Sequence, residues 1–397
     1  MKQTVSSVVM GANFGDEGKG LITDFEVRRT GAKTVCRFNG GAQAGHTVND
    51  GEKRHVFGHL GSGFFAGADT HLSSKFIINP MILEKEMGAL GLSSFPSVSS
   101  DARVTTIYDM MLNSLAEISR GQNKHGSCGM GINETVTRHN FYPLTVKFLA
   151  CADMSEIISM VDNIRWKWVP TRMAGLRITE VPAPYNQIME MEVEDVVNDL
   201  IGIPTKLYFS PKSLVKDGVV FEGAQGLALD EFMGTFPHVT RSMTGLPYAI
   251  LAASELGIKT LQPTYVTRSY LTRHGAGPLQ DEGVPFGGSP VDMTNVNNPW
   301  QGSLRYAPLN VMDLSDRIHD DFNRSTFIAQ AHGIELLRPT LAVTCLDQIE
   351  ETVVVRFGDR LKSIPIEKLP EYLGVHLDLK ISHESRGPSA NQVYFCE

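Results

Sequence analysis

The chain has 397 residues and a formal net charge of −8 at pH 7, which argues against a nucleic-acid or membrane-surface protein. Its five cysteines include no C-x-x-C pair, which indicates reduced thiols in a cytoplasm-like compartment and no zinc site of familiar spacing. No apolar run reaches the roughly 18 residues of a membrane span, and the N-terminus reads as a strand rather than a signal peptide.

The first predicted elements are a strand, a glycine-rich turn and a helix. Residues 4–10 are small and β-branched, residues 11–20 are rich in glycine, and Leu21 can begin a helix. In this layout the backbone N–H groups of the turn and the helix N-terminus attract phosphate oxygens. Lys19 would add a full positive charge, so the segment predicts a phosphate-binding loop.

This loop departs from familiar nucleotide-binding loops. Asn13 and Gly20 stand where a Walker A loop needs Gly and then Ser or Thr. A carboxylate, Asp16, also stands inside the loop, where it would repel phosphate unless it binds a metal ion or takes a proton from a second substrate. Either role would make Asp16 part of a reaction rather than of a simple binding site. The alternative is a surface turn whose acidic residues cap the helix.

A second strand, residues 34–38, also runs into a glycine cluster, residues 39–47. Two such loops after successive strands fit an α/β sheet that binds ligands at the carboxyl edge of its strands. Asp16 and His46 would then reach the same edge, as a carboxylate base and a histidine acid. The alternative is a structural histidine, the commoner role of a lone one.

The rest of the chain alternates strands, helices and polar loops. We expect one α/β domain over residues 1–397, with a mainly parallel central sheet flanked by helices. Its predicted parts are strands at 76–78, 219–226, 264–267 and 341–344, an edge strand at 352–357, a helix at 81–90 opened by Asn79 and Pro80, strand then helix at 104–115, a glycine-rich stretch at 121–139, a mainly helical insertion at 140–215 and a long substrate loop at 279–304.

Three further residues have side chains suited to recognition, each with a structural alternative. Gln225 both donates and accepts, so it could read a purine edge or satisfy backbone groups in its own loop. Arg305 could hold a small carboxylate by a bidentate pair or lie on the surface. Asp347 resembles the aspartate with which GTP-using proteins read guanine, although aspartates are common at strand ends.

Taken together, these segments resemble the adenylosuccinate synthetase family. Five motifs occur in family order and cover most of the chain: residues 15–20, 40–47, 221–226, 273–278 and the Leu346–Asp347 pair. The resemblance implies a ligase in which GTP phosphorylates the 6-oxygen of a purine nucleoside monophosphate and L-aspartate displaces that phosphate.

The resemblance also implies roles for individual residues. Asp16 would take the purine N1 proton and, with the Gly45 carbonyl, hold Mg²⁺. His46 would assist phosphoryl transfer by a hydrogen bond to the moving charge, and Lys19 would stabilise the transferring group. GTP is expected as the phosphoryl donor, with ATP disfavoured by the retained Asp347.

Binding residues follow from the same resemblance. The candidates for the acceptor nucleotide are Asn13, Gln43, Ser127, Cys128, Glu134, Arg138, Gln225 and Thr240, with Arg138 donated across the interface of a homodimer. The phosphate loop would include Gly15, Glu17, Gly18 and Gly20. The candidates for aspartate are Thr294, Asn295 and Arg305, and those for the guanine base of GTP are Cys345, Asp347, Gly387 and Pro388.

Several segments depart from the cellular enzymes of the family. Residues Ser127 and Cys128 replace two threonines, the stretch from there to Arg138 is short, and residues 294–305 replace a basic aspartate loop. These changes are similar to the archaeal enzymes and to a phage branch that accepts dGMP and makes the diaminopurine precursor. A phage origin would place the protein in the host cytoplasm.

The choice of acceptor depends on the purine 2-amino group. Leaving its N–H donors unpaired would cost about 1–3 kcal/mol, and Ser127, Asn133 and Glu134 could accept from them. We therefore expect dGMP as acceptor, with IMP as the alternative that the retained Asp16 favours. An alternative of another class is a nucleotide-binding regulator without ligase activity, which only the altered loop at 294–305 supports.

Overall fold

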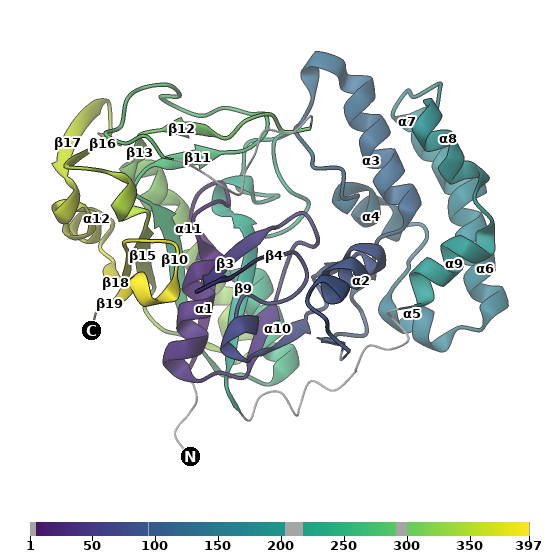
Figure 1. Cartoon of the computed structure of the whole chain (residues 1–397), viewed down its shortest axis with the longest axis horizontal. Coiled ribbons are helices and arrows are strands. Elements are labelled where there is room, and N and C mark those ends of the chain that lie inside the picture. The colour runs from purple at the N-terminus through teal and green to yellow at the C-terminus, as the bar shows by residue number, and fades with distance from the viewer. Residues whose placement is uncertain (1–4, 94, 203–216, 291–299, 397) are drawn as a thin grey trace.

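The core of the protein is a mainly parallel sheet (Figure 1). The computed structural model describes residues 5–93, 95–202, 217–290 and 300–396. Within these residues the sheet has ten strands, with β14 (Glu335–Leu336) beside β10 and the others in the spatial order β19 (Val393–Phe395), β18 (Lys380–Ser385), β15 (Thr340–Thr344), β10 (Thr260–Arg268), β1 (Val5–Gly11), β9 (Val219–Gly226), β2 (Thr34–Arg37), β5 (Asp69–Leu72) and β7 (Ser97–Val98). Only the pairing of β18 with β19 is antiparallel.

Strand β1 lies between β10 and β9 and is buried on both faces. Val8 and Met10 belong to one apolar layer, and Val9, between them, belongs to the other. Successive side chains of a strand point to opposite faces, so a strand covered on both sides is apolar throughout. The small and apolar run at the start of the sequence therefore folds as a central strand.

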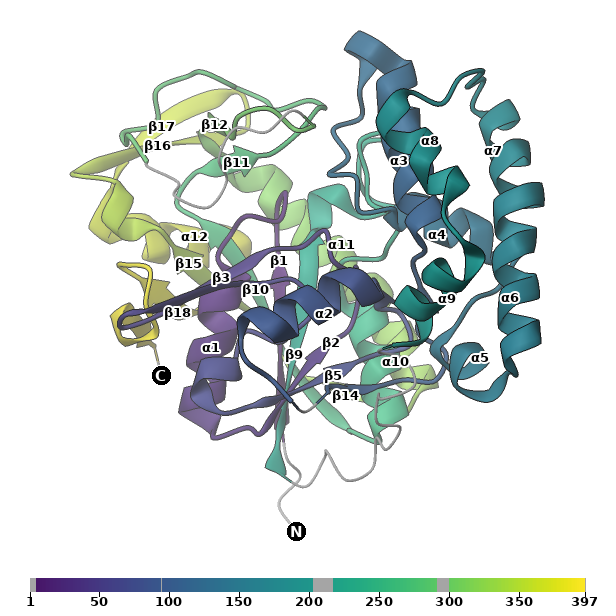
Figure 2. The ribbon, with the colours of Figure 1, turned by 45° about the vertical axis from the view of Figure 1, so that its right-hand side comes forward.

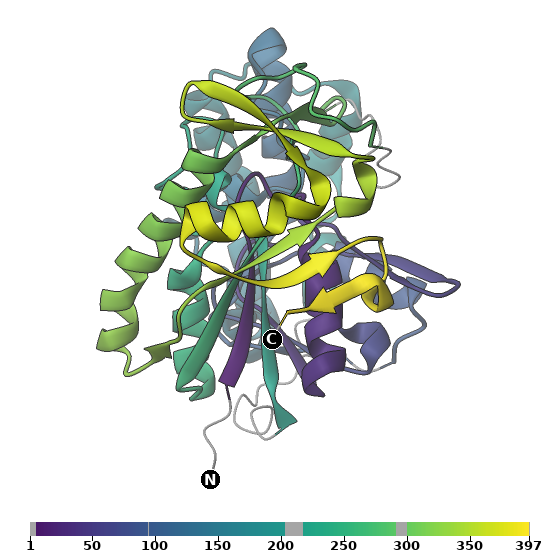
Figure 3. The same cartoon turned by 90° about the vertical axis from the view of Figure 1, so that its left-hand side faces the viewer.

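Helices cover both faces of the sheet (Figure 3). Helix α1 (Lys19–Thr30) packs Leu21 and Ile22 against the layer that contains Val9. Helices α10 (Leu246–Leu256), α11 (Val311–Ala331) and α12 (Leu369–Leu377) contribute to the layer that contains Val8. This layered arrangement confirms the predicted fold class.

A group of helices beside the sheet has its own apolar core (Figures 1 and 2). The helices that form this core are α2 (Pro80–Ala89), α3 (Ile107–Arg120), α5 (Val146–Cys151), α6 (Met154–Asn163), α7 (Val169–Gly175), α8 (Ala183–Glu190) and α9 (Val193–Ile201). Helix α4 (Ile132–His139) is joined to α3 by the Arg138–Asp109 ion pair and places Ile132 and Val136 in a small separate cluster with Ile77. Helices α5–α9 fall within the predicted helical stretch at 140–215, of which residues 203–216 lie outside the described residues. No helix in the described ranges is long and apolar enough to cross a membrane.

Short strands form smaller sheets around this frame. The pairs are β3 (His46–Asp50) with β4 (Lys53–Phe57), β6 (Ile77–Ile78) with β8 (Arg103–Val104), and β11 (Leu271–Arg273) with β12 (Arg305–Ala307). Strand β16 (Thr352–Phe357) lies in the middle of a three-stranded sheet, between β13 (Leu309–Asn310) and β17 (Arg360–Pro365). The prediction of an edge strand at 352–357 is therefore wrong, because the strand pairs on both sides.

Candidate functional site

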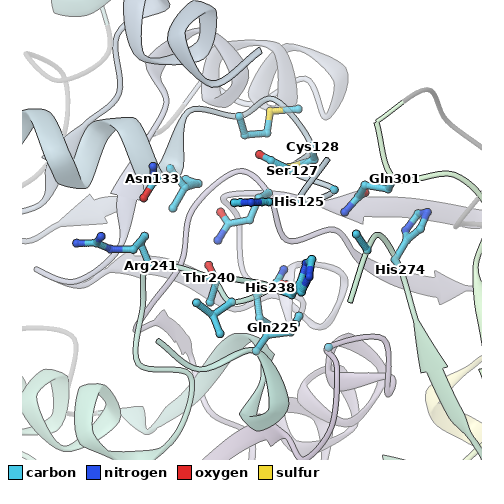
Figure 4. A pocket seen from close by; sticks show the side chains of 18 of the residues that line it. His125, Ser127, Cys128, Asn133, Gln225, His238, Thr240, Arg241, His274 and Gln301 are labelled. Carbon is cyan, nitrogen blue, oxygen red and sulfur yellow. The ribbon is translucent and has the colours of Figure 1, made fainter. Parts of the chain in front are cut away.

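Loops at the carboxyl edge of the sheet enclose a cavity of about 630 Å³ (Figure 4). Its wall includes the two glycine loops after β1 and β2, residues 113–120 of α3, residues 125–134 from the α3–α4 loop into α4, residues 225–241 after β9, and residues 273–276 at the end of β11. The predicted site residues that line it are Gly15, Asp16, Gln43, Gly45, His46, Ser127, Cys128, Glu134, Gln225 and Thr240. These predicted residues come from four separate parts of the sequence.

The glycine loop after β1 is shaped by Glu17. This side chain is buried, and its Oε1 accepts hydrogen bonds from the backbone N–H groups of Asn13 at 3.0 Å and Gly15 at 2.8 Å. The Glu17 carbonyl accepts from Thr344 Oγ1 at 2.7 Å. Gly18 caps α1 with a φ of 91°, in the left-handed region that favours glycine. Glu17 therefore holds the loop in shape from inside.

Lys19 lies in the first turn of α1 with its ammonium group inside the same loop. Its side chain is 1% exposed, Nζ donates to the Gly15 carbonyl, and Nζ lies 3.5 Å from Glu17 Oε2. Lys19 does not line the cavity. The role predicted for Lys19, stabilising the transferring phosphoryl group, stays a prediction, and the charge of Lys19 lies behind the loop backbone.

Asp16 and Asn13 occupy different positions in the loop. Asp16 is half-buried and lines the cavity, and its backbone carbonyl accepts a hydrogen bond from Arg268 Nε. Asn13 is buried: its Nδ2 donates to Thr267 Oγ1 at 2.9 Å, and its Oδ1 accepts from Arg317 Nη2 at 2.7 Å. The structure thus does not bring Asn13 to the cavity as predicted, because both ends of its amide tie the loop to β10 and α11.

His46 begins β3 and pairs with a buried glutamate of β9. Its Nδ1 lies 2.6 Å from Glu222 Oε1, and their side chains are 5% and 0% exposed. Glu222 also accepts from the Ser62 backbone N–H at 3.0 Å and from the Ser62 hydroxyl. Arg37 Nε lies 3.9 Å from Glu222 Oε2. The carboxylate is therefore held by groups from three segments of the chain.

Burial and neighbouring charges set the protonation of this pair. Burial lowers the pKa of His46 to about 4 despite the opposing effect of Glu222, so the imidazole is neutral at pH 7. Burial by itself would raise the pKa of Glu222, but His46, Arg37 and Ser62 bring that pKa to about 2. A neutral His46 that donates from Nδ1 to Glu222 has an unprotonated Nε2. That buried nitrogen has no hydrogen-bond partner in the part of the chain that the structure describes.

Two amides and two smaller side chains line the cavity near this pair. The Nε2 and Oε1 atoms of Gln43 are buried, with no hydrogen-bond partner among the described residues. Gln225 has a φ of 64°, a left-handed conformation that few residues other than glycine adopt. Ser127 Oγ donates to Asn113 Oδ1 at 2.9 Å, and burial raises the pKa of the Cys128 thiol. The amides can donate and accept, which suits recognition of a purine edge.

Glu134 lines the cavity as one member of an ion pair between α4 and α7. Its Oε2 accepts from Arg172 Nε at 2.7 Å, and its Oε1 accepts from Arg172 Nη2 at 3.0 Å. The Asn133 side-chain amide donates to the same Oε1 at 2.8 Å. These three bonds occupy much of the acceptor capacity of the carboxylate.

Arg138 is placed differently from the prediction. Its side chain is 0% exposed, and it pairs with Asp109, which is also 0% exposed, at 2.9 Å. The Val104 and Tyr142 carbonyls accept from Nη2 at 2.7 Å and from Nη1 at 2.8 Å. An arginine with its guanidinium buried among partners of its own chain cannot reach a second protomer. Arg138 therefore stabilises the junction of α3 and α4, and the homodimer stays a prediction.

Of the residues predicted to bind aspartate, Arg305 is described by the structure and makes contacts with its own chain. Arg305 Nη1 lies 2.7 Å from Glu282 Oε2, and its Nη2 donates at 2.8 Å to the carbonyls of both Gly275 and Gly277. The guanidinium therefore holds the loop after β11, in contrast to the predicted contact with a substrate carboxylate. Thr294 and Asn295 lie outside the described residues.

The predicted guanine-reading residues lie at a neighbouring position on the same edge. Cys345 and Asp347 directly follow β15, and Gly387 and Pro388 follow the adjacent strand β18. Asp347 is exposed, and the Pro388 carbonyl accepts from Asn49 Nδ2 at 3.2 Å. Asn49 belongs to β3, the strand that starts with the cavity residue His46.

Comparison with known proteins identifies the family. A family model described as Adenylosuccinate synthetase matches residues 8–289. The chain belongs to this family. An adenylosuccinate synthetase of Clostridium botulinum (strain Eklund 17B / Type B) is 32% identical over 292 residues, and one of Pelotomaculum thermopropionicum is 30% identical over 290 residues. Each match covers 69% of this chain and 65% of the relative, so the similarity spans just under two thirds of the relatives' length.

Solved structures of adenylosuccinate synthetase and of a related phage enzyme share the fold. The fully ligated adenylosuccinate synthetase of Plasmodium falciparum has a TM-score of 0.73 at 19% identity, covering 99% of this chain and 100% of that one. Succinoaminodeoxyadenylate synthetase of cyanophage S-2L, bound to dGMP and to dATP as an energy donor, has a TM-score of 0.62 at 13% identity, covering 99% and 96%. At these identities the likeness concerns the fold.

The resemblance to adenylosuccinate synthetases implies a magnesium ion, and the cavity offers suitable oxygen donors. Asp16 and Gly45 both line it. Within the described ranges, no group of three or more His, Cys, Asp or Glu side chains could hold a metal ion. Mg²⁺ commonly uses one or two carboxylates together with water and substrate phosphates rather than a full protein cage. The residues present therefore fit the ion.

Some cavity residues were not predicted from the adenylosuccinate synthetase motifs. Glu222 lies behind the cavity residue His46; it belongs to a predicted motif, but only the fold shows that the two side chains pair. His125, His238 and Arg241 also line the cavity, and the rings of the two histidines lie 5.8 Å apart. The sequence signal for Arg241 was its position directly after Thr240, a predicted nucleotide contact.

Proposed function

We propose that the chain is a GTP-dependent ligase that joins L-aspartate to C6 of a purine nucleoside monophosphate, with dGMP as the preferred acceptor. The product from dGMP would be N6-succino-2-amino-2'-deoxyadenylate. One observation carries the proposal: Asp16 and His46, whose buried Nε2 has no hydrogen-bond partner among the described residues, line one cavity with two side-chain amides, Gln43 and Gln225. That combination supplies acid/base chemistry and purine recognition together.

Asp16 acts first in the proposed reaction. Its carboxylate takes the proton from purine N1, and the electron pair released makes the 6-oxygen nucleophilic. That oxygen attacks the γ-phosphoryl group of GTP, forms an O–P bond and expels GDP. The amine of aspartate then attacks C6 and forms a C–N bond, the C–O bond breaks so that phosphate leaves, and the proton lost by the amine passes to solvent. Bound Mg²⁺, held by Asp16 and Gly45, would neutralise negative charge on the nucleotide phosphates.

His46 and Glu222 work as a pair in this proposal. The arriving phosphoryl group brings negative charge, which favours uptake of a proton from solvent by His46 Nε2, and the Glu222 carboxylate balances the resulting imidazolium. Nε2 then donates to the moving phosphoryl group. Lys19 adds its positive charge from behind the backbone of the glycine loop after β1. The backbone N–H groups of that loop are the hydrogen-bond donors.

The wall at residues 127–134 supports a guanylate acceptor. The Ser127 hydroxyl donates to Asn113, which leaves its own lone pairs able to accept from a 2-amino group. The Asn133 side-chain carbonyl is a second candidate acceptor. Glu134 contributes less than we expected from the sequence, because Arg172 and Asn133 already occupy its carboxylate.

IMP is the second candidate acceptor. Asp16 is retained and lines the cavity, where it would accept the N1 proton of hypoxanthine as readily as that of guanine. The curated relatives are adenylosuccinate synthetases, which also favours this reading.

A panel of acceptors tests the proposal. The protein is incubated with L-aspartate, GTP, Mg²⁺ and either dGMP, GMP or IMP, and phosphate release and the succinylated product are measured. Fastest turnover of dGMP is the expected result. Turnover of IMP alone would leave a conventional adenylosuccinate synthetase, and tight binding without phosphate release would favour a regulator.

The phosphoryl donor needs its own test, since the cyanophage structure holds dATP. Asp347 is exposed at the end of β15, where its carboxylate can accept from two guanine donors. The Asp347→Asn variant should lose preference for GTP over ATP, because an amide cannot accept from both donors. Glu350→Gln, a nearby exposed carboxylate, is the control. An unchanged donor preference would remove this role from Asp347.

A further inference from the structure

Two neighbouring carbonyls of the glycine loop after β1 are bound by the ends of β10 and β15. Arg268, the last residue of β10, donates from Nε to the Asp16 carbonyl. Thr344, the last residue of β15, donates from Oγ1 to the Glu17 carbonyl at 2.7 Å. Arg268 is half-buried and does not line the cavity that the described residues form. It therefore holds the proposed base by its backbone, as a positioning residue rather than a catalytic one.

Arg268 also reaches the turn in which the predicted guanine contact lies. Its Nη1 donates to the Tyr270 hydroxyl at 3.2 Å, and that hydroxyl donates to Gln348 Oε1. Gln348 ends the short 3-10 turn Leu346–Gln348 (the donor turn), which directly follows β15. A continuous chain of hydrogen bonds thus runs from the donor turn through Tyr270 and Arg268 to the Asp16 carbonyl.

Tyr270 is tightly packed within this chain of bonds. Its side chain is 1% exposed, and its ring stacks on Phe286 with the centroids 4.8 Å apart. Burial raises the pKa of the Tyr270 hydroxyl, so the hydroxyl keeps its proton and can donate to Gln348 while it accepts from Arg268. A packed ring cannot turn without displacing its neighbours. A displacement of the donor turn would therefore shift Arg268 as well.

A second set of bonds joins the end of β10 to the donor turn. Ser269, between Arg268 and Tyr270, donates from its backbone N–H to the Thr344 carbonyl at 3.0 Å and from Oγ to the Cys345 carbonyl at 3.0 Å. Cys345 has a φ of 59°, a conformation that costs free energy in a residue other than glycine and persists only where the surroundings hold it. The end of β10 thus fastens both the donor turn and the glycine loop.

We propose that Arg268 couples the donor turn to Asp16, so that a nucleotide bound at the donor turn fixes the position of the base that acts on the acceptor. The proposal rests on the proposed function, because donor and acceptor are assigned to these two positions there. A guanine bound at the donor turn holds Gln348 in place, and Tyr270 and Arg268 pass this constraint to the loop. The coupling is reciprocal, so each nucleotide strengthens binding of the other by the same factor.

Equilibrium binding tests the coupling without any ligation. Isothermal titration measures the affinity for dGMP and for IMP, in the presence of Mg²⁺, with and without a saturating non-hydrolysable GTP analogue. The wild type should bind the acceptor about 5- to 150-fold more tightly when the analogue is present. Tyr270→Phe, which removes only the hydroxyl, should reduce this factor about 2- to 10-fold, the range of one hydrogen bond. The affinity without the analogue should be nearly unchanged.

Gln348→Met should act like Tyr270→Phe, because it removes the acceptor of the same hydroxyl. The double variant should be no worse than either single variant, since both break one link. Non-additivity of this kind is the signature of two residues that act through each other.

Steady-state kinetics test the positioning of Asp16. Arg268→Met frees the Asp16 carbonyl, and a misplacement of about 1 Å costs about 100-fold in rate, so kcat should fall by about that factor. KM for the acceptor should rise only as far as the lost coupling factor. Arg268→Lys should recover part of kcat, because an ammonium group can still donate to the carbonyl.

Arg317→Met is the matched control. Arg317 of α11 binds the start of the same loop, through the Ala12 carbonyl at 3.2 Å and Asn13 Oδ1 at 2.7 Å. Its loss should loosen the loop but leave the coupling factor at the wild-type value. Thermal unfolding shows which variants are folded, and Tyr270→Phe remains decisive if Arg268→Met does not fold.

The coupling is overturned if the analogue leaves the acceptor affinity of the wild type unchanged or if Tyr270→Phe keeps the wild-type factor. It is also overturned if Arg268→Met keeps the wild-type kcat, or if Arg317→Met lowers the coupling factor as much as Arg268→Met. Wild-type protein that shows the coupling but does not ligate aspartate would overturn the proposed function and support the coupling. Protein that ligates aspartate without any coupling would do the reverse.

Discussion

The two carboxylates nearest the proposed reaction lie in opposite environments, which gives them different tasks. Glu222 is fully buried and is held by His46, Ser62 and Arg37. Asp16 is half-buried and lines the cavity. A carboxylate open to the cavity can exchange a proton with a ligand. The Glu222 carboxylate, which is held by several partners, can only orient His46 and balance its charge.

Replacing Asp16 by Asn should abolish proton abstraction without unfolding the protein. General-base catalysis contributes about 10²- to 10⁴-fold to rate, so turnover of the best acceptor should fall by about that factor. The side chain lies on a loop at the cavity, so the melting temperature should change little. Steady-state kinetics and thermal unfolding check both expectations. The exposed Glu52, changed to Gln, is the control, and wild-type turnover in Asp16→Asn would refute the assignment.

Replacing Glu222 by Gln should impair His46 rather than nucleotide binding. The amide cannot balance an imidazolium, so the Nε2 proton that stabilises the moving phosphoryl group becomes less favourable. We expect kcat to fall about 100-fold, the scale of one lost electrostatic contact, with KM for the nucleotides nearly unchanged. Steady-state kinetics over a range of pH, with kcat and KM determined separately at each pH, test this expectation. A rise in KM with constant kcat would show that Glu222 serves binding instead.

At the scale of elements, α3 and α4 are joined by a buried ion pair. Asp109 caps α3 through a capping box with Thr106 and also binds Arg138 of α4. The sequence segment between these helices, residues 125–131, forms part of the cavity wall. The pair therefore positions a binding wall without contacting the ligand.

Arg138→Leu should destabilise the fold strongly, because it leaves Asp109 buried without its partner. Breaking a buried ion pair in this way costs about 3–5 kcal/mol, which urea unfolding measures. The double variant Asp109→Asn/Arg138→Leu should recover part of that loss. If Arg138 instead reached the nucleotide of a second protomer, Arg138→Leu would weaken nucleotide binding with little change in unfolding.

For the whole molecule, buried neutral histidines predict a loss of stability in acid. His46 and His71 are buried, and burial lowers the pKa of each to about 4 from 6.5. Between these values the unfolded chain binds a proton that the folded chain does not. The free energy of unfolding should therefore be highest above pH 6.5 and fall as the pH drops toward 4, by up to about 3 kcal/mol per histidine.

His71 separates this effect from catalysis, because it does not line the cavity. Its Nδ1 lies 2.9 Å from Ser97 Oγ, a contact that an amide can replace. The His71→Asn variant should show a shallower pH dependence of the free energy of unfolding between pH 6.5 and 4, measured by urea titration at several pH values. A slope equal to that of the wild type would show that His71 does not remain neutral when folded.

Local patterns were sufficient for most elements of the fold. The apolar run of β1, the cap at Asn79 and the strands that end in glycine loops follow from short-range rules of packing and turn chemistry. The edge strand at 352–357 was predicted wrongly because pairing partners come from distant segments. The alternation of apolar and polar residues along a strand shows which face of the strand is buried, but not how many other strands pair with it.

The sequence by itself determined that two glycine loops, Asp16 and His46 would meet at one edge of a parallel sheet, because that edge is where the loops of such sheets emerge. The tertiary structure decided which charges are available there. In the folded chain the side chains of Lys19 and Glu17 lie inside the loop, and Arg138 is buried against Asp109. His46 pairs with a carboxylate 176 residues away in the sequence. These outcomes depend on desolvation and long-range partners, which spacing along a chain does not encode.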